Sequence, residues 1–159
     1  MAPKLFFLGE GPNMNSLRAQ LPQSSEEGSR DCAVLFEVQR AACPYELISL
    51  LGGLENKRLL LIAVTPLADS SDFHRQLESQ ILPFLPDSCQ YLGLQLCPGE
   101  MEPESLFFFT SFLQKTGHSE RLYRFHRAYA ASRRHPDGQD AAALQSLLQQ
   151  TFPAEVCQK

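Results

Sequence analysis

Residues 30–66 read RDCAVLFEVQRAACPYELISLLGGLENKRLLLIAVTP, and this stretch decides the fold. The mostly apolar run 32–38 has the length of a buried strand, and 58–64 is the most apolar run in the chain. Between them, 45–51 predicts a short helix that ends at the glycine pair 52–53. A strand, a helix and a second strand in this order predict a parallel pair of strands.

The same alternation extends in both directions from this stretch. Further strands are predicted at 4–8 and 90–97, and further helices at about 14–21, 71–85, 106–116, 119–134 and 140–150. Alternating strands and helices predict one α/β domain over residues 1–159, a parallel sheet with helices on both faces. The sheet is expected to have four strands, or five with one more between Leu21 and Asp31, where PQSSEEGSRD is polar.

Helix ends and faces can be assigned in more detail. Asn13 or Asn15 is expected to cap the first helix, and Arg18 to lie at the edge of its apolar stripe with its charged head in water. Asp137 or Asp140 is expected to cap the last helix. The apolar face of the helix at 71–85 is predicted to comprise Phe73, Leu77, Ile81 and Phe84, with a frayed last turn at Pro83.

Composition excludes several classes of protein. Of the 159 residues, 43% are hydrophobic and 20% charged, as in a globular domain with a proper core. The formal net charge of −4 argues against nucleic acid as a general partner, and no apolar run reaches membrane-spanning length. The N-terminal apolar stretch is too short for a signal peptide, so we expect a cytoplasmic protein.

Five cysteines are present, an odd number, and no CxxC motif occurs. We therefore expect neither a disulfide framework nor a zinc site, and the histidines lack partners at ligand spacing, so no metal ligands are assigned. A nucleophile elbow, a paired-carboxylate signature and a P-loop consensus are all missing from the sequence. No catalytic residue is assigned, and whether the chain is an enzyme stays open.

The chain as a whole resembles the flavodoxin-like family. The strand–helix–strand of residues 30–66, the strand and loop CQYLGLQLCPGEMEPE and the closing helix HPDGQDAAALQSLLQQ carry the resemblance. It implies a three-layer sandwich, an FMN cofactor and electron transfer. The FMN phosphate would lie in the loop after the first strand, and the flavin ring near the later strand-end loops.

The resemblance and the strand ends together give the candidate cofactor-binding residues, because ligands of such sheets bind beyond the carboxyl ends of the strands. They are Gly9, Gly11, Asn13, Asn15, Gln39, Tyr45, Thr65, Cys97 and Gly99. Each has a structural alternative: a tight turn for the glycines and asparagines, helix packing for Tyr45, and burial at a strand end for Cys97. Ser70 and Ser71 are either ligand donors or helix caps.

The first turn departs from the family pattern. The family's loop resembles Thr-Gly-Asn-Thr, whereas Gly11 is followed here by Pro12, Asn13 and Met14. Two hydroxyl donors and one backbone N–H are therefore missing, and Glu10 adds a like charge beside the expected phosphate. We interpret this turn as a degraded phosphate site.

A basic run lies late in this acidic chain. Residues 118–135 read HSERLYRFHRAYAASRRH, and the helix within Arg121–Arg134 is either a docking surface for an acidic redox or other protein partner or a solvated helix face. Two functions follow. The first is FMN-dependent electron transfer with weak or altered FMN binding. The alternative is a cofactor-free flavodoxin-like module that binds a partner protein.

Overall fold

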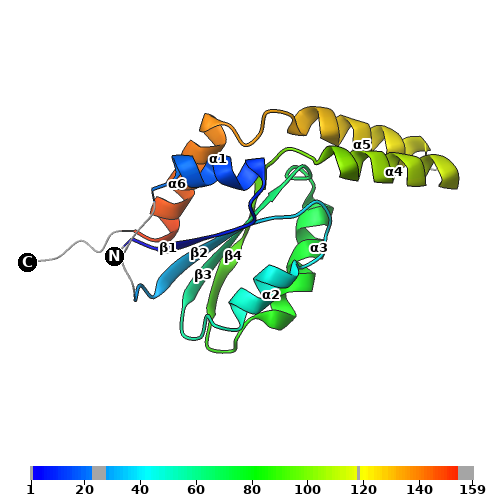
Figure 1. Ribbon diagram of the computed structural model, residues 1–159. Coiled ribbons are helices and arrows are strands. Elements are labelled where there is room, and N and C mark those ends of the chain that lie inside the picture. Colours follow the sequence, from blue (N-terminus) through cyan, green and yellow to red (C-terminus); the bar gives the residue numbers. More distant parts are fainter. Residues whose placement is uncertain (1, 23–27, 118, 154–159) are drawn as a thin grey trace, which may run out of the picture.

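The computed structural model describes residues 2–22, 28–117 and 119–153. Four parallel strands form one sheet in the order β1-β2-β3-β4, with helices on both faces (Figure 1). The strands are β1 (Lys4–Leu8), β2 (Asp31–Glu37), β3 (Arg58–Thr65) and β4 (Gln90–Pro98). The helices are α1 (Pro12–Gln20), α2 (Tyr45–Leu51), α3 (Ser71–Ile81), α4 (Pro103–Thr116), α5 (Ser119–Ser132) and α6 (Gly138–Thr151), with a 3₁₀ turn η1 (Leu82–Phe84) after α3. The predicted three-layer sandwich is confirmed.

The sheet divides the core into two layers. Alternate residues of β2 and β3, such as Val34 and Leu61, face α2 and α3, whose Leu47 and Leu77 are fully buried. The other set, such as Leu35, packs against α1 and α6. Because β2 and β3 lie in the middle and are covered on both faces, they read in sequence as continuous apolar runs rather than alternating ones.

Most element boundaries predicted from the sequence are confirmed to within a few residues. The inward positions of α6 and the exact bounds of β1 and α2 agree with the prediction. The described residues between Leu21 and Asp31 contain no strand, which leaves β1 at the edge of the sheet. Cys157 and His118 lie outside the described residues, and the four described cysteines are free thiols.

Three local predictions are wrong. Gly11, not Asn13 or Asn15, is the N-cap of α1, because the helix begins at Pro12, two residues before the predicted start. The guanidinium of Arg18 donates to the carbonyls of Phe7 and Gly9 rather than extending into water. Phe84 is 43% exposed, because α3 ends at Ile81 and the following 3₁₀ turn rotates the ring off the buried face.

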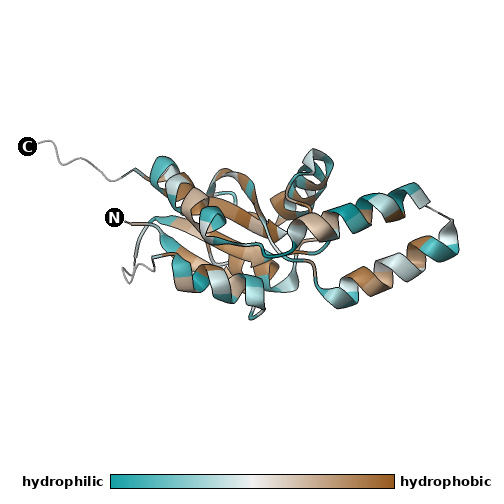
Figure 2. Ribbon diagram, turned by 90° about the horizontal axis from the view of Figure 1, so that it is seen from above, coloured by the Kyte–Doolittle hydropathy of each residue, from teal (hydrophilic) through white to brown (hydrophobic). Residues whose placement is uncertain are grey.

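Helices α4 and α5 form a hairpin between the last strand and the closing helix. The two helices pack on each other and project beyond the end of the sheet (Figures 1 and 2). Gly117 ends α4 in the left-handed conformation that lets the chain reverse. No helix in the described ranges is long and apolar enough to cross a membrane.

Candidate functional site

The carboxyl ends of all four strands meet at one edge of the sheet, and the candidate site lies there. The loop after β1 leads into α1, the loop after β2 runs through residues 38–44, and the loop after β4 leads into α4. In a parallel sheet these loops converge, so residues far apart in sequence come into contact.

Asn13 lies at the centre of this edge. Its side chain is only 5% exposed, because it is held between β2 and the loop after β4. Asn13 Nδ2 donates to Glu37 Oε1 at 2.9 Å and to the Glu100 carbonyl at 3.0 Å. Asn13 Oδ1 accepts from the Glu100 N–H at 3.1 Å. Every polar atom of this side chain is therefore used by the protein itself.

The Glu37 carboxylate fills the space beside the first turn. A Cβ placed on Gly11 would lie 3.1 Å from Glu37 Oε2, so the carboxylate rests directly against the backbone at the N-terminus of α1. A helix N-terminus favours a negative charge, and here a side chain supplies it. Burial raises the pKa of the Glu37 carboxyl, the hydrogen bond from Asn13 opposes that shift, and the nearby Glu102 adds to it.

The remaining groups of the turn are also committed to protein contacts. The Gly9 carbonyl accepts from Arg18 at 3.1 Å, and Asn15 Nδ2 donates to the Glu10 carbonyl at 3.1 Å. Gly9 itself has a φ of +114°, a conformation that L-residues with a side chain rarely adopt. The turn is a tight strand-to-helix connection in which the Asn13 side chain faces the protein, whereas Glu10, Pro12 and Asn15 are exposed.

These contacts test whether an FMN phosphate fits at this turn. A phosphate at the Gly11–Asn13 backbone would meet the Glu37 carboxylate, and like charges about 4 Å apart repel by about 4 kcal/mol near a protein surface. Asn13 would have to give up its bonds to Glu37 and Glu100 to bind it. The residues present do not fit the phosphate, and no step through FMN is derived.

Gly99 is required by close packing at the same edge. A Cβ at this position would lie 2.6 Å from Val64 Cγ1 and 3.1 Å from Asn13 Nδ2. The Gly99 N–H donates to the Thr65 carbonyl at 3.1 Å, and Thr65 Oγ1 accepts from the Leu67 N–H at 3.2 Å. Thr65 and Gly99 therefore join Gly11 and Asn13, but as packing and turn residues.

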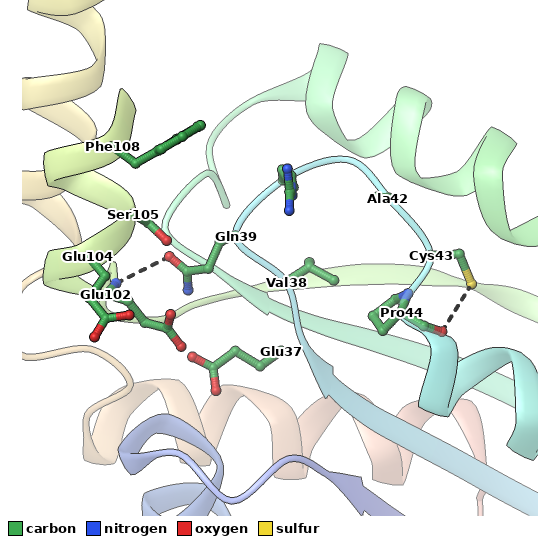
Figure 3. Close-up of a pocket in the computed structure, with 11 residues that line it drawn as sticks. Glu37, Val38, Gln39, Ala42, Cys43, Pro44, Glu102, Glu104, Ser105 and Phe108 are labelled. Carbon is green, nitrogen blue, oxygen red and sulfur yellow. Dashed lines mark hydrogen bonds between the residues drawn. The ribbon is translucent and has the colours of Figure 1, made fainter. Parts of the chain in front are cut away.

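A pocket of about 590 Å³ opens next to this cluster, between the loop after β2 and the start of α4 (Figure 3). Gln39 lies in its wall, where its Oε1 accepts from the Glu102 N–H at 3.2 Å and its buried Nε2 has no hydrogen-bond partner among the described residues. Three carboxylates, those of Glu37, Glu102 and Glu104, line the pocket together with the guanidinium of Arg40. The lining therefore carries charges of both signs, with acidic groups in excess.

Two of the predicted site residues lie apart from this cluster. Tyr45 is 82% exposed on the first turn of α2 and is not part of the pocket lining. Cys97 is buried on the face of the sheet covered by α1 and α6, and burial, aided by Asp140 and Asp137, raises the pKa of its thiol to about 12. Ser70 caps α3, since its Oγ accepts from the Phe73 N–H at 3.1 Å.

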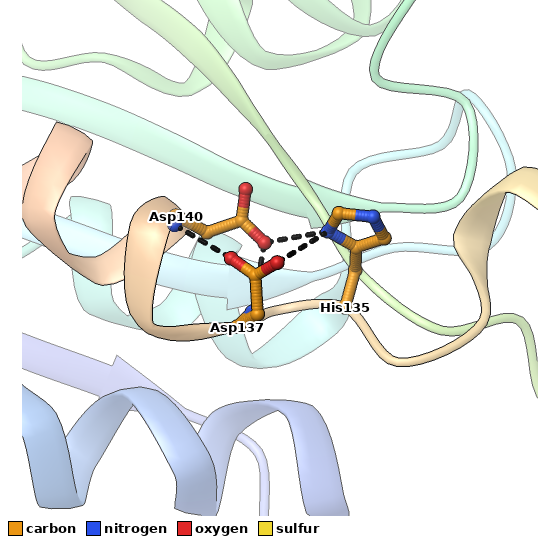
Figure 4. A group of neighbouring side chains, drawn as sticks. All are labelled: His135, Asp137 and Asp140. Carbon is orange, nitrogen blue, oxygen red and sulfur yellow. Dashed lines mark hydrogen bonds and ion pairs between the residues drawn. The ribbon is translucent and has the colours of Figure 1, made fainter.

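A second cluster of titratable groups lies where α6 begins. His135, Asp137 and Asp140 place ligand atoms within 4.8 Å of one another (Figure 4). Asp137 is the N-cap of α6, and it forms a reciprocal capping box with Asp140 where the sequence predicted one of the two as the cap. His135 Nδ1 lies 2.6 Å from Asp140 Oδ2, and this hydrogen bond raises the pKa of His135. The expectation that the histidines lack carboxylate partners is therefore wrong for His135, because the turn before α6 brings it beside both aspartates.

Sequence reasoning missed Glu37 and the role of Glu100. The signal for Glu37 is a single charged residue near the end of an apolar strand, at the edge where the family places its ligand. Glu100 acts through its backbone, which no side-chain pattern reveals.

The chain matches a known protein family. The family described as "Flavodoxin domain" matches residues 18–149. No curated protein matches the chain.

Proposed function

The chain belongs to the flavodoxin-domain family, and from this premise we propose that it acts as a cofactor-independent protein-interaction module. The observation that carries the proposal is the α4–α5 hairpin, which projects beyond the sheet (Figure 2). Several of its large apolar and aromatic side chains are exposed. Phe107 and Tyr123 are 76% and 64% exposed. Exposed aromatic side chains gathered on one element mark interaction surfaces.

The basic face of α5 supports an acidic partner. Arg121, Arg124 and Arg127 are exposed on this helix of a chain whose net charge is −4. Glu120 pairs with Arg124 at 3.2 Å, and the guanidinium of Arg127 lies 5.8 Å from the centre of the Tyr123 ring. Arg121 and Arg127 thus add positive charge to a helix on which Glu120 offsets the charge of Arg124, and a partner that presents carboxylates would be attracted to it.

The contacts at the first turn support independence from a cofactor. The Glu37 carboxylate and the Glu100 backbone take the hydrogen bonds of Asn13 that the family resemblance assigns to a phosphate. The protein thereby links β2, α1 and the loop after β4 without a bound group. We place this module in the cytoplasm and assign it no nucleic acid partner.

FMN-dependent electron transfer is the second candidate function. The pocket at the carboxyl edge favours it, because its volume of about 590 Å³ and its position match the region that the resemblance assigns to a flavin ring. In this candidate the ring loops hold the cofactor weakly and the first turn does not hold its phosphate.

A fluorescence titration with FMN separates the two candidates. We expect the wild type to leave flavin fluorescence unquenched up to high micromolar FMN. The variant Glu37→Ala should gain measurable binding because it removes the charge beside Gly11, whereas Glu104→Ala, which removes another carboxylate of the same pocket, should not. Saturable quenching of the wild type at low micromolar FMN would favour electron transfer instead.

Partner docking is tested by charge reversal on α5. The wild type, the triple variant Arg121→Glu, Arg124→Glu, Arg127→Glu and the control Arg75→Glu on α3 are immobilised and exposed to cytosolic extract. We expect acidic proteins retained by the wild type and the control to be lost from the triple variant and at high salt. Retention that does not depend on these arginines or on salt would contradict docking through α5.

A further inference from the structure

The turn before α6 gathers ligand atoms of the kinds that transition metals bind. His135, Asp137 and Asp140 each offer one such atom, and these atoms lie within 4.8 Å of one another (Figure 4). His135 Nδ1 is 2.6 Å from Asp140 Oδ2 and 4.0 Å from Asp137 Oδ2. An imidazole nitrogen together with two carboxylates is a mixed donor set, which distinguishes this group from a patch of acidic side chains.

The helix cap orients both carboxylates and leaves lone pairs for a cation. Asp137 Oδ1 accepts from the Asp140 N–H at 2.9 Å, and Asp140 Oδ2 accepts from the Asp137 N–H at 2.8 Å. Asp137 turns its other oxygen, Oδ2, toward His135 (Figure 4). A carboxylate oxygen has two lone pairs, so Asp140 Oδ2 can bind a cation while it keeps its bond to the backbone. Hydrogen bonds of this kind hold metal ligands in place from their outer side.

The negative charge around His135 is not balanced by cationic side chains. The hydrogen bond with Asp140 raises the pKa of His135 most, and the charges of Asp137 and of Asp69, in the loop after β3, add to the shift. In the ranges that the structure describes, none of these three aspartates forms an ion pair with a lysine or an arginine. Carboxylates from two separate segments therefore surround one imidazole, and their excess of negative charge is what a divalent cation would balance. Because Asp69 lies outside the helix cap, capping does not account for this excess.

The distances fit Zn²⁺ after small movements of the side chains. Tetrahedral Zn²⁺ with bonds of about 2.0–2.2 Å places neighbouring ligand atoms about 3.3–3.6 Å apart. The observed separations from His135 Nδ1, 2.6 Å and 4.0 Å, lie on either side of this range. Each carboxylate oxygen has to move by about 0.5–1 Å to reach it, which rotation of a side chain supplies. The side chains of His135 and Asp137 are 31% and 44% exposed, so a cation can enter from solvent.

We propose that His135 Nδ1, Asp137 Oδ2 and Asp140 Oδ2 are the ligands of a Zn²⁺ site that joins the turn after α5 to the first turn of α6. The cation takes the place of the proton between His135 and Asp140. A water molecule completes the coordination, as in zinc sites with three protein ligands. Mg²⁺ and Ca²⁺ are poor occupants because they prefer ligand sets made of oxygen alone. The inference is independent of partner docking through α5.

Calorimetric titration of the full chain with ZnCl₂, under a phosphine reductant, tests the proposal. The wild type is expected to bind one Zn²⁺ with a Kd of about 1–10 µM. His135→Gln should weaken binding by at least about 100-fold, because loss of a ligand costs more than the 10–100-fold that loss of an outer partner costs. The matched control His126→Gln removes an exposed histidine of α5 and should keep the wild-type Kd. A wild type that binds no Zn²⁺, or a His135→Gln variant that binds it as tightly, would overturn the site.

Asp137→Asn separates loss of a ligand from loss of the helix cap. Asparagine caps a helix about as well as aspartate, so α6 should stay folded, which far-UV circular dichroism measures. We expect the affinity for Zn²⁺ to fall about 10–100-fold, since one ligand charge is removed while the cap remains. An unchanged affinity in this variant would contradict the three-ligand arrangement.

Nitrogen NMR of the ¹⁵N-labelled imidazoles identifies the ligand atom. Zn²⁺ is expected to shift the Nδ1 resonance of His135 and to leave the ring nitrogens of His74 and His126 in place. Titration with Co²⁺ then distinguishes this site from the cysteines, because a thiolate ligand adds a charge-transfer band in the near ultraviolet and a nitrogen and oxygen ligand set does not. A thiolate band together with an unmoved His135 Nδ1 would assign the metal to the cysteines and refute the proposal.

Discussion

Replacing Asn13 by alanine tests the contacts that tie the carboxyl edge of the sheet together. The substitution removes the bond to Glu37 and the two bonds exchanged with the Glu100 backbone, and it leaves a half-buried carboxylate without its donor. A hydrogen bond to a charged group contributes about 1.5–3 kcal/mol and a neutral one about 0.5–1.5 kcal/mol. The loop after β4 lies near water, so water can replace part of the hydrogen bonding that the Glu100 backbone loses. We therefore expect a loss of about 3 kcal/mol in the free energy of unfolding.

Urea unfolding followed by far-UV circular dichroism measures this loss, with an m-value unchanged from the wild type. Asn15→Ala is the matched control, since Asn15 lies two residues away on the same helix but is exposed. Its side chain donates to the Glu10 carbonyl and accepts from Arg18 Nη1, and both bonds are exposed. We expect the control to cost less than about 1 kcal/mol. Equal losses in the two variants would refute the assignment of Asn13 as the central link.

Further predictions concern packing and titration. Gly99→Ala is expected to lower stability by about 1–3 kcal/mol in the same assay, because its new methyl would overlap Val64. Folding raises the pKa of the Glu37 carboxyl above its ordinary value of 4.5, so the stability that this group contributes below pH 4.5 declines as the pH rises through the folded pKa. Glu37→Gln should therefore gain stability relative to the wild type across this pH range. A difference between the two proteins that does not change with pH would contradict the prediction. The pKa of His135 is also raised, so its contribution to stability is complete below pH 6.5 and is lost as the pH rises through the folded pKa. His135→Gln should therefore destabilise the protein most in mild acid, which thermal melts at several pH values measure. The buried Cys97 thiol, with a pKa of about 12, should react with a maleimide at pH ~8 far more slowly than the partly exposed cysteines, which peptide mapping by mass spectrometry can determine.

The architecture could be predicted from the sequence because burial on two faces leaves a strong pattern. The runs at 32–38 and 58–64 are apolar apart from Glu37 and Arg58, since β2 and β3 occupy the middle of the sheet. The glycine pair 52–53 marked the end of α2, and the aspartates at 137 and 140 marked the start of α6. A helix or strand can be predicted from its own residues where their local preference agrees with their burial in the fold.

The site could be predicted only in part, because its contacts join distant residues. Gly11, Asn13 and Gly99 were predicted at the carboxyl edge of the sheet and lie there, yet the side chain that contacts Gly11 and Asn13 is Glu37, 24 residues from Asn13 in sequence. Whether a polar side chain faces a ligand or another strand depends on tertiary register, which no short motif encodes. The start of α1 was misplaced for a related reason, since Pro12 begins the helix and leaves Asn13 free to bond across the sheet edge.

The protein's own Glu37 carboxylate lies against the first turn of the fold, where the family resemblance places a phosphate. A titration of ¹⁵N-labelled protein with FMN, followed by the backbone amides of Gly11 and Asn13 and the Asn13 side-chain amide, tests whether this carboxylate keeps the phosphate out. These resonances are expected to stay in place in the wild type and to shift on addition of FMN only in Glu37→Ala. Saturable shifts of the same resonances in the wild type would show that the turn binds FMN despite Glu37.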